Sequence, residues 1–149
     1  MTLWVLDTDS LSLLERGNPK IQERLSQVNA DSVAISIVTA EEKMKGRLAA
    51  INSLSGIERI VRVASALPSR LALAYRALQS SIEDLQTLPI LPFSELAKDR
   101  YRDLLQQKIR VGSHDLRIAA IVLSVEGILV TRNRRDFEKV PGLQLDDWS

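Results

Sequence analysis

The sequence contains no cysteine and only one histidine among its 149 residues. Disulfide bonds and thiolate metal sites are therefore excluded, and a zinc site is disfavoured because zinc prefers imidazole and thiolate ligands. Any metal ion would be bound by oxygen. The chain also lacks an apolar run near the roughly 20 residues that a membrane helix needs, and its first residues do not form a secretory signal. We therefore expect a cytoplasmic protein.

An excess of charge of one sign is missing as well. The sequence has 20 Lys+Arg against 19 Asp+Glu, so its net charge gives no global argument for nucleic-acid binding, and such an argument must rest on local clusters. Hydrophobic residues make up 45% and charged residues 26%, which is the balance of a globular protein. A chain of this length fits one domain of ordinary size. We therefore predict a single domain over residues 1–149.

Short apolar runs alternate with amphipathic stretches along the chain. Strands are predicted at 3–6, 32–38, 89–92, 128–130 and 143–145, and helices at 8–14, 19–28, 39–54, 95–109 and 116–123. The run 32–38 is continuous and β-branched, which is typical of a parallel strand covered on both faces. The segment between Pro89 and Pro92 favours an edge strand. Alternating strands and helices predict an α/β fold, a three-layer α/β/α sandwich with a central, mostly parallel sheet.

Residues 57–88 have a helical pattern almost throughout. The Leu67-Pro68 step predicts a break between two helices, because proline disfavours helix at the residue before it. In the second helix, apolar residues recur every three or four positions and form one face; they are Leu71, Tyr75, Leu78, Ile82 and Leu85. The pair is predicted either to project as a helical insertion or hairpin around 57–88, or to cover the sheet. Both arrangements fit ordinary amphipathic packing.

Four carboxylates lie where an apolar strand gives way to a helix or loop: Asp7, Glu42, Asp115 and Asp136. In an open parallel sheet the carboxyl ends of the strands converge on one crevice, so acids placed after strands become neighbours. Carboxylates that close together need a cation, and magnesium and manganese prefer oxygen ligands. A pair of such ions about 4 Å apart activates water and stabilises the leaving oxygen in phosphodiester hydrolysis. The spacing therefore indicates a metal-binding site.

Asp7 and Glu42 also have ordinary structural explanations. A carboxylate directly after a buried strand must be satisfied, and the polar residues 8–10 are available to cap the following helix, so we favour a functional role for Asp7. The segment from Thr39 to Glu42 has the spacing of a capping box, in which the glutamate bonds back to the backbone. On spacing alone, that explanation is the stronger one for Glu42.

The ordinary explanations for the other two acids are electrostatic. Asp115 lies in the first turn of a helix, where the macrodipole favours an acid, and Asp136 would pair with nearby arginines. The basic cluster Arg132, Arg134 and Arg135 adjoins Asp136. It would position an RNA backbone through phosphate contacts that carry little sequence information. A solvated charged loop explains any single arginine equally well.

Four segments together resemble the PIN domain, and within it the VapC-like toxins of toxin–antitoxin pairs. Residues 6–10 match the aspartate after the family's first strand, and residues 36–46 match a strand followed by threonine, glutamate and glycine. Residues 111–120 match a glycine and an aspartate ahead of a small-residue helix. Residues 129–143 form the most family-specific stretch. The resemblance covers most of the chain.

The resemblance implies a metal-dependent endoribonuclease that uses Mg²⁺ or Mn²⁺. The residues implied as metal ligands and catalytic groups are Asp7, Glu42, Asp115 and Asp136, with Asp9, Thr131 and Asn133 in support. Glu42 is preferred to Glu41 because the family's threonine-x-x-glutamate and glutamate-x-x-x-glycine spacings both select it. The resemblance further implies an RNA substrate, a small antitoxin that inserts into the acidic groove, and a homodimer. The chain departs from the family at Asp9, where asparagine is more frequent, and in its long segment 57–88.

Two other functions fit parts of the sequence. The Asp7-Thr8-Asp9 segment also resembles the paired aspartates of haloacid-dehalogenase-like phosphatases. That family uses a late acidic pair, and the nearest candidate here, Asp146-Asp147, is predicted to follow a terminal loop rather than a strand. A non-catalytic RNA- or protein-binding module is the third hypothesis; it predicts weak metal affinity and RNA binding that Asp7→Asn leaves unchanged. His114 is discounted as a general base, because attack by metal-activated hydroxide needs no histidine.

Overall fold

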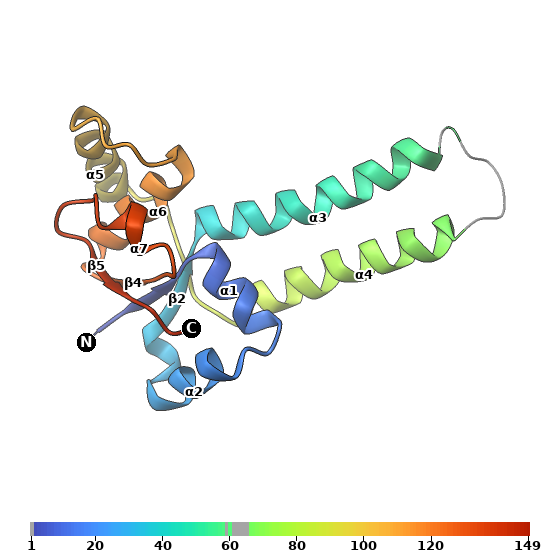
Figure 1. Ribbon diagram of the computed structural model, residues 1–149, viewed down its shortest axis with the longest axis horizontal. Helices are drawn as coiled ribbons and strands as arrows, with labels where there is room; N and C mark the ends of the chain where they lie inside the picture. Colours follow the sequence, from blue (N-terminus) through green and yellow to red (C-terminus); the bar gives the residue numbers. More distant parts are fainter. Residues whose placement is uncertain (1, 59, 61–65) are drawn as a thin grey trace. The chain divides into compact units, whose positions relative to one another are not determined.

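The computed structural model describes residues 2–58, 60 and 66–149 (Figure 1). It divides into two compact units, which we call the sheet unit (Met1–Ala40 and Leu88–Ser149) and the helical unit (Glu41–Thr87). Within the described residues, the sheet unit carries a five-stranded sheet in the order β3-β2-β1-β4-β5. All four strand pairings are parallel. The predicted parallel sheet is thereby confirmed.

The strands are short and consist of the predicted apolar runs. They are β1 (Trp4–Leu6), β2 (Val33–Ser36), β3 (Ile90–Leu91), β4 (Ile128–Val130) and β5 (Gln144–Asp146). All four residues of β2 are buried, as expected of a strand covered on both faces. Strand β1 lies at the centre, and its last residue, Leu6, is in register with Ile35 of β2 and Val130 of β4. The residues that follow these strands therefore share one edge of the sheet, its carboxyl edge.

Helices cover both faces of this sheet. The sheet unit contains α1 (Thr8–Glu15), α2 (Pro19–Gln27), the 3₁₀ turn η1 (Ala30–Ser32), α5 (Glu95–Gln106), α6 (Ser113–Ser124) and α7 (Arg134–Phe137). Val5 and Leu129 belong to the core cluster formed with α5, α6 and α7. Because side chains alternate along a strand, the buried Leu6 and Val130 point to the other face. There α1 packs against β1 and α2 (Figure 1). This is the predicted three-layer arrangement.

The main correction concerns residues 37–38, which were expected to continue the strand 32–38. They instead begin α3 (Ile37–Glu58). The Oγ of Ser36 accepts a hydrogen bond from the backbone N–H of Thr39 at 3.1 Å, which is the bond of a helix N-cap. A capping serine at the end of β2 therefore starts the helix two residues earlier than the β-branched run suggests.

Two smaller boundary corrections fall near the carboxyl end. Helix α5 ends at Gln106 rather than 109, because Lys108 adopts a positive φ of 53° and the right-handed helix cannot continue through it. Strand β5 covers Gln144–Asp146 rather than 143–145. The expected edge strand between the two prolines is confirmed as β3, which pairs only with β2 among the described strands.

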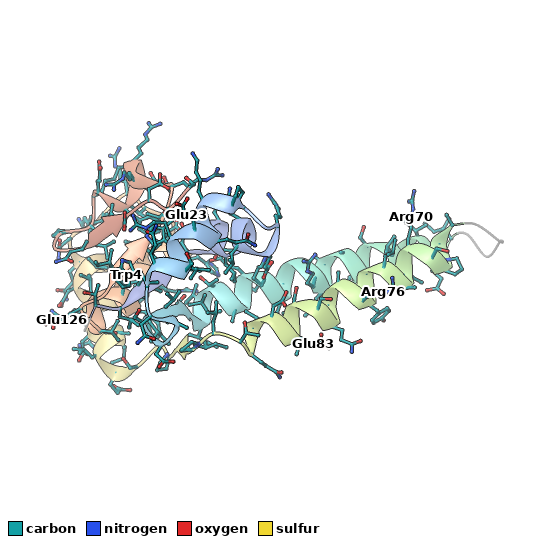
Figure 2. The ribbon with its side chains drawn as sticks, turned by 90° about the horizontal axis from the view of Figure 1, so that it is seen from below. Trp4, Glu23, Arg70, Arg76, Glu83 and Glu126 are labelled. Atoms are coloured by element: carbon teal, nitrogen blue, oxygen red, sulfur yellow. The ribbon has the colours of Figure 1, made fainter. Side chains whose placement is uncertain are left out.

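The helical unit consists of α3 from Glu41 onward and α4 (Leu67–Leu85), which lie side by side in both views (Figures 1 and 2). Arg47 of α3 donates a hydrogen bond from Nε to Oγ of the buried Ser81 of α4 at 2.9 Å. Helix α4 begins at Leu67 with Pro68 in its first turn, which agrees with the predicted break. The helix predicted between 57 and 66 falls largely outside the described residues.

The apolar face predicted on α4 is only partly buried. Leu85 is 7% exposed, whereas Tyr75 is 56% and Ile82 is 44% exposed. Arg70, Arg76 and Glu83 project from the same helix (Figure 2).

Among the helices in the described part of the chain, none is long and apolar enough to cross a membrane.

Candidate active site

Asp7 lies at the carboxyl edge of the sheet, directly after the central strand β1, and is 6% exposed. Its backbone N–H donates to the Val130 carbonyl at 3.1 Å, and its Oδ1 accepts the Ser10 backbone N–H at 2.8 Å. Asp7 is therefore the N-cap of α1. The expectation that one of residues 8–10 provides the cap is wrong, because the strand ends one residue before Asp7 and leaves it in the extended conformation that a cap requires.

The environment of Asp7 opposes its ionisation. Burial raises the pKa of Asp7 above its ordinary value of 3.8, and the nearby charge of Asp9 raises it further. Hydrogen bonds from Thr131 and Ser10 lower the pKa but do not cancel the effect of burial. A buried carboxylate held at the edge of a sheet by hydroxyl and amide donors fits the role of a cation ligand, because a cation would stabilise its charged form.

Hydroxyl groups from three segments meet next to Asp7, at the ends of β1 and β2. Thr8 donates from Oγ1 to Oγ1 of Thr39 at 3.3 Å, and Ser36 donates from Oγ to the same atom at 3.3 Å. Ser36 and Thr39 are fully buried. Ser10 donates from Oγ to the Val130 carbonyl at 3.0 Å. We did not predict these serines as part of the site, although a polar residue immediately after a buried strand is the signal that identified Asp7.

Glu42 lies in α3, one turn beyond the residues that begin this helix. The capping box expected from Thr39 to Glu42 is absent, because Thr39 already lies inside the helix and its N–H donates to Ser36. Instead, Oε1 of Glu42 is buried and has no hydrogen-bond partner among the residues that the structure describes. A buried carboxylate oxygen without a donor is costly. The ordinary explanation for Glu42 is therefore lost, and a ligand role gains support.

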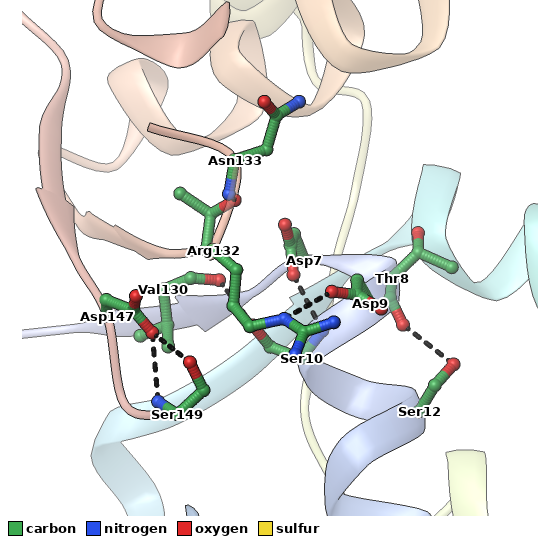
Figure 3. Close-up of polar contacts among 11 residues, drawn as sticks. Asp7, Thr8, Asp9, Ser10, Ser12, Val130, Arg132, Asn133, Asp147 and Ser149 are labelled. Carbon is green, nitrogen blue, oxygen red and sulfur yellow. Dashed lines mark hydrogen bonds and ion pairs between the residues drawn. The ribbon is translucent and has the colours of Figure 1, made fainter. Parts of the chain in front are cut away.

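The loop after β4 is bound to the start of α1 by several contacts (Figure 3). The buried Thr131 contributes a hydrogen bond that lowers the pKa of Asp7, and its Oγ1 accepts the backbone N–H of Asn133 at 2.9 Å. Arg132 donates from Nε to Oδ2 of Asp9 at 2.9 Å. The structure thus brings three of the predicted residues, Asp9, Thr131 and Arg132, into contact with Asp7 or with its helix.

Asp115 occupies the first turn of α6, as expected, and is half-buried. Helix α6 packs against β2 and β4. It ends at Ser124, shortly before β4 begins at Ile128, so its last turn lies near the amino end of that strand. A helix that runs antiparallel to the strands in this way directs its first turn, and Asp115, toward the carboxyl edge.

Asp136 lies in the first turn of the short helix α7. Its Oδ2 accepts a hydrogen bond from Nδ2 of Asn133 at 3.1 Å, and its Oδ1 is 3.6 Å from Nζ of Lys139. The hydrogen bond from Asn133 is the main cause that holds the pKa of Asp136 below its ordinary value, and the charge of Lys139 also lowers it. The ion pair is thus formed with a lysine, while the charge of the expected arginine, Arg135, also lowers the pKa of Asp136. Arg134 and Arg135 are exposed.

Asp146 ends β5, which corrects the expectation that it follows a terminal loop. Its Oδ2 accepts hydrogen bonds from Nη2 of Arg24 at 2.9 Å and Nε1 of Trp148 at 3.0 Å. The Arg24 guanidinium also lies 5.4 Å from the centre of the Trp148 ring. These contacts give Asp146 a structural role between α2 and β5, so the acidic pair that a dehalogenase-like phosphatase needs is not available.

No group of three or more acidic or histidine side chains in the described residues is close enough, as they stand, to hold one metal ion. Contacts in the structure join Thr131 to Asp7 and Arg132 to Asp9, and a hydrogen bond joins Asn133 to Asp136. The structure places Glu42 in the second turn of α3 and Asp115 in the first turn of α6. The four-carboxylate site remains a prediction.

No protein-family model matches the chain. Among curated proteins, it is similar to the tRNA(fMet)-specific endonuclease VapC of Salmonella typhimurium, with 30% identity over 149 residues that cover 99% of each chain. It is also similar to Ribonuclease VapC1 of Haemophilus influenzae strain R2866, with 27% identity over 99% of this chain and 98% of that protein.

Two solved structures share the architecture. DNA-bound VapBC from Salmonella typhimurium matches with a TM-score of 0.73 and 25% identity, covering 100% of both chains. VapBC-1 from nontypeable Haemophilus influenzae matches with a TM-score of 0.72 and 22% identity, covering 99% of this chain and 98% of that one. These similarities include the segments that form both units.

Proposed function

The chain belongs to the VapC family of ribonucleases, and we propose that it is an endoribonuclease that hydrolyses RNA phosphodiester bonds as the toxin of a toxin–antitoxin pair. Its similarity to a VapC endonuclease extends over 99% of both chains. The observation that carries the location of the site is Asp7, a buried carboxylate at the carboxyl end of the central strand. In open parallel sheets, that end is where ligands bind.

We propose Mg²⁺ or Mn²⁺ as the cofactor, held by Asp7, Glu42, Asp115 and Asp136. The donor set consists of carboxylate oxygens, which these ions prefer. The buried Oε1 of Glu42, which lacks a hydrogen-bond donor among the described residues, fits the coordination of a cation.

When bound, a divalent ion activates water and stabilises the charge that develops on the leaving oxygen. The protein contributes the orientation of the ligands: Thr131 and Ser10 hold the carboxylate of Asp7, and Asn133 holds that of Asp136. Such supporting hydrogen bonds fix the direction in which a carboxylate presents its lone pairs. The arginines of the cluster Arg132, Arg134 and Arg135 would contact backbone phosphates without selecting a sequence.

A protein partner follows from the same family. Two solved relatives are VapBC assemblies, and a third is described as a toxin–antitoxin complex from Klebsiella pneumoniae. We propose that a small antitoxin neutralises this chain by inserting into the acidic groove, that the toxin forms a homodimer, and that it acts in the cytoplasm, where its RNA substrate is found.

The proposal is tested with purified protein and single-stranded RNA in the presence of Mg²⁺ or Mn²⁺. Wild type is expected to cleave, and Asp7→Asn and Asp115→Asn are expected to lose cleavage while keeping the circular dichroism spectrum of the wild type. Asp99→Asn is the matched control, because Asp99 lies on α5 and pairs with Arg102 of the same helix at 3.6 Å. Retained metal-dependent cleavage in both site variants would reject the assignment.

Expression in cells gives an independent test of the substrate. New RNA ends should appear with the wild type and be missing with Asp115→Asn, and their positions identify the RNA that is cut. A pattern of ends that is the same for both proteins would show that the cleavage does not come from this site.

A further inference from the structure

The end of β4 and the start of α1 are joined by a series of contacts that extends from Asp7 to Asp9. The Val130 carbonyl accepts from the Asp7 N–H at 3.1 Å and from Ser10 Oγ at 3.0 Å. Two residues along on each side, Arg132 Nε donates to Asp9 Oδ2 at 2.9 Å (Figure 3). Asp9 lies in the first turn of α1, which Asp7 caps. Arg132 is therefore attached to the same helical turn that holds the buried carboxylate.

The bond to Asp9 uses the inner nitrogen of the guanidinium. This leaves the outer edge of the group, formed by Nη1 and Nη2, outside that bond, and the Arg132 side chain is 50% exposed. An arginine fork of two parallel N–H donors matches the oxygens of a phosphate. An arginine that is already fixed through Nε also loses less conformational freedom when it binds.

Asp147 also interacts with Arg132, but through its charge rather than through a hydrogen bond to the outer edge of the guanidinium. The pKa of Asp147 is lowered overall: burial raises it, but hydrogen bonds from Ser149 and then the charges of Arg134 and Arg132 outweigh this effect. Asp147 accepts its hydrogen bonds from Ser149, at 2.9 Å from the backbone N and 2.6 Å from Oγ. Its interaction with Arg132 is purely coulombic in the causes of its pKa shift.

We propose that Asp9 is a positioning residue, which holds Arg132 so that the outer edge of its guanidinium binds a phosphate of the RNA backbone beside Asp7. This inference rests on the proposed ribonuclease function and assigns a role to the position at which the chain departs from its family. It also separates Asp9 from the metal ligands, because the Oδ2 of Asp9 is already engaged by Arg132.

A purely structural role makes a different prediction. Exposed ion pairs contribute little to stability, and both side chains here are about half exposed. If the ion pair only stabilised the fold, its loss would lower the melting temperature slightly and would leave RNA affinity unchanged. The test therefore measures RNA affinity, and it uses a double-mutant cycle to detect coupling between the two residues.

The experiment measures binding of a fluorescein-labelled single-stranded RNA by anisotropy, with a chelator present so that metal-dependent cleavage cannot occur. Arg132→Gln should weaken binding about tenfold, the size expected for loss of a charge-assisted contact. Asp9→Asn should weaken it about threefold, and the double variant should bind no worse than Arg132→Gln alone. Asp9→Glu, which keeps the charge, should bind like the wild type.

The matched control is Asp99→Asn, which removes the acid of another exposed aspartate–arginine pair, on α5. It should leave RNA affinity unchanged. Additive losses from Asp9→Asn and Arg132→Gln would overturn the inference, and so would an Asp9→Asn variant that binds RNA as tightly as the wild type. Titration with Mn²⁺, followed by its electron paramagnetic resonance signal, provides a second readout. Asp9→Asn should keep the wild-type affinity, and a loss as large as that of Asp7→Asn would make Asp9 a ligand instead.

Failure of this inference is distinguishable from failure of the proposed function. If the wild type cleaves RNA but the cycle is additive, only the role of Asp9 is wrong. If the cycle shows coupling but the wild type does not cleave RNA with either metal, the phosphate contact stands and the ribonuclease proposal is rejected. A wild type that does not bind RNA overturns both.

Discussion

Replacing Asp7 with asparagine should leave the protein at least as stable as the wild type while abolishing cleavage. Asn accepts the same capping hydrogen bond as Asp and is an equally good N-cap, so the 2.8 Å bond from the Ser10 N–H should persist. The substitution removes the buried charge whose burial raises the pKa of Asp7. The charged form of Asp7, which the proposed function needs, therefore lowers the stability of the fold.

The size of the effect is read from a comparison with Asp7→Ala. Alanine removes the capping acceptor, which costs about 1 kcal/mol, and it also leaves the Thr131 donor without its acceptor. Asp7→Ala should therefore be about 1–2 kcal/mol less stable than Asp7→Asn. For a chain of this size, about 2–4 °C of melting temperature corresponds to each kcal/mol. Thermal unfolding by circular dichroism resolves such a difference.

The stability difference between wild type and Asp7→Asn should depend on pH with a defined sign. Because the pKa of Asp7 is raised in the folded state, folded protein holds this proton more tightly than unfolded protein does. The cost of the charge is absent below the ordinary pKa of 3.8 and is fully present above the raised pKa. Wild-type stability should therefore fall relative to Asp7→Asn as the pH rises through this window, and the difference should then stay constant.

Urea unfolding of both proteins between pH 3.5 and pH 7 measures this difference directly, and contributions from other titrating groups cancel in it. A wild type that gains stability over Asp7→Asn as the pH rises would refute the reasoning, because it would mean that the fold favours the charged form of Asp7. An Asp7→Asn variant no more stable than Asp7→Ala would refute the assignment of the N-cap.

Three further predictions concern other residues and the metal. Glu42→Met should abolish cleavage and raise the free energy of unfolding by about 1–2 kcal/mol in urea titrations, because it removes a buried oxygen that has no donor among the described residues. Millimolar Mn²⁺ should raise the melting temperature of the wild type by mass action and leave that of Asp7→Asn unchanged; an equal rise in both would place the ion elsewhere. Gly127→Ala should lower the free energy of unfolding by about 1–3 kcal/mol with cleavage retained, because its Cβ would lie 3.0 Å from the Leu3 carbonyl oxygen.

The layer architecture was predictable because the buried strands are continuous apolar runs. Residues 128–130 were placed correctly from composition and from the glycine before them. The start of α3 was not, because Ile37 and Val38 have the side chains of a strand, and the capping bond of Ser36 overrides this preference. The prediction of the α1 cap was wrong for a related reason. Several neighbouring residues are able to cap this helix, and the residue at which β1 ends determines which of them is the N-cap.

The contacts within the candidate site were not predictable from local pattern. Arg132 and Asp9 are 123 residues apart, and no local periodicity relates them. The resemblance to a family selected Glu42 where spacing alone favoured a capping box, and the structure shows that Thr39 lies inside the helix and forms no such box. The family relationship thus indicates the chemistry, whereas the structure shows the hydrogen bonds that orient Asp7.

Strand β3 has a consequence for self-association. It is two residues long, forms the rim of the sheet, and is flanked by Pro89 and Pro92, which have no N–H to donate. A short edge strand bounded by prolines offers few free N–H donors to an incoming strand. Natural β-sheets use such edge strands to prevent edge-to-edge aggregation. Pairing of copies through this edge is therefore disfavoured, and concentrated solutions should remain free of amyloid-type fibres nucleated there.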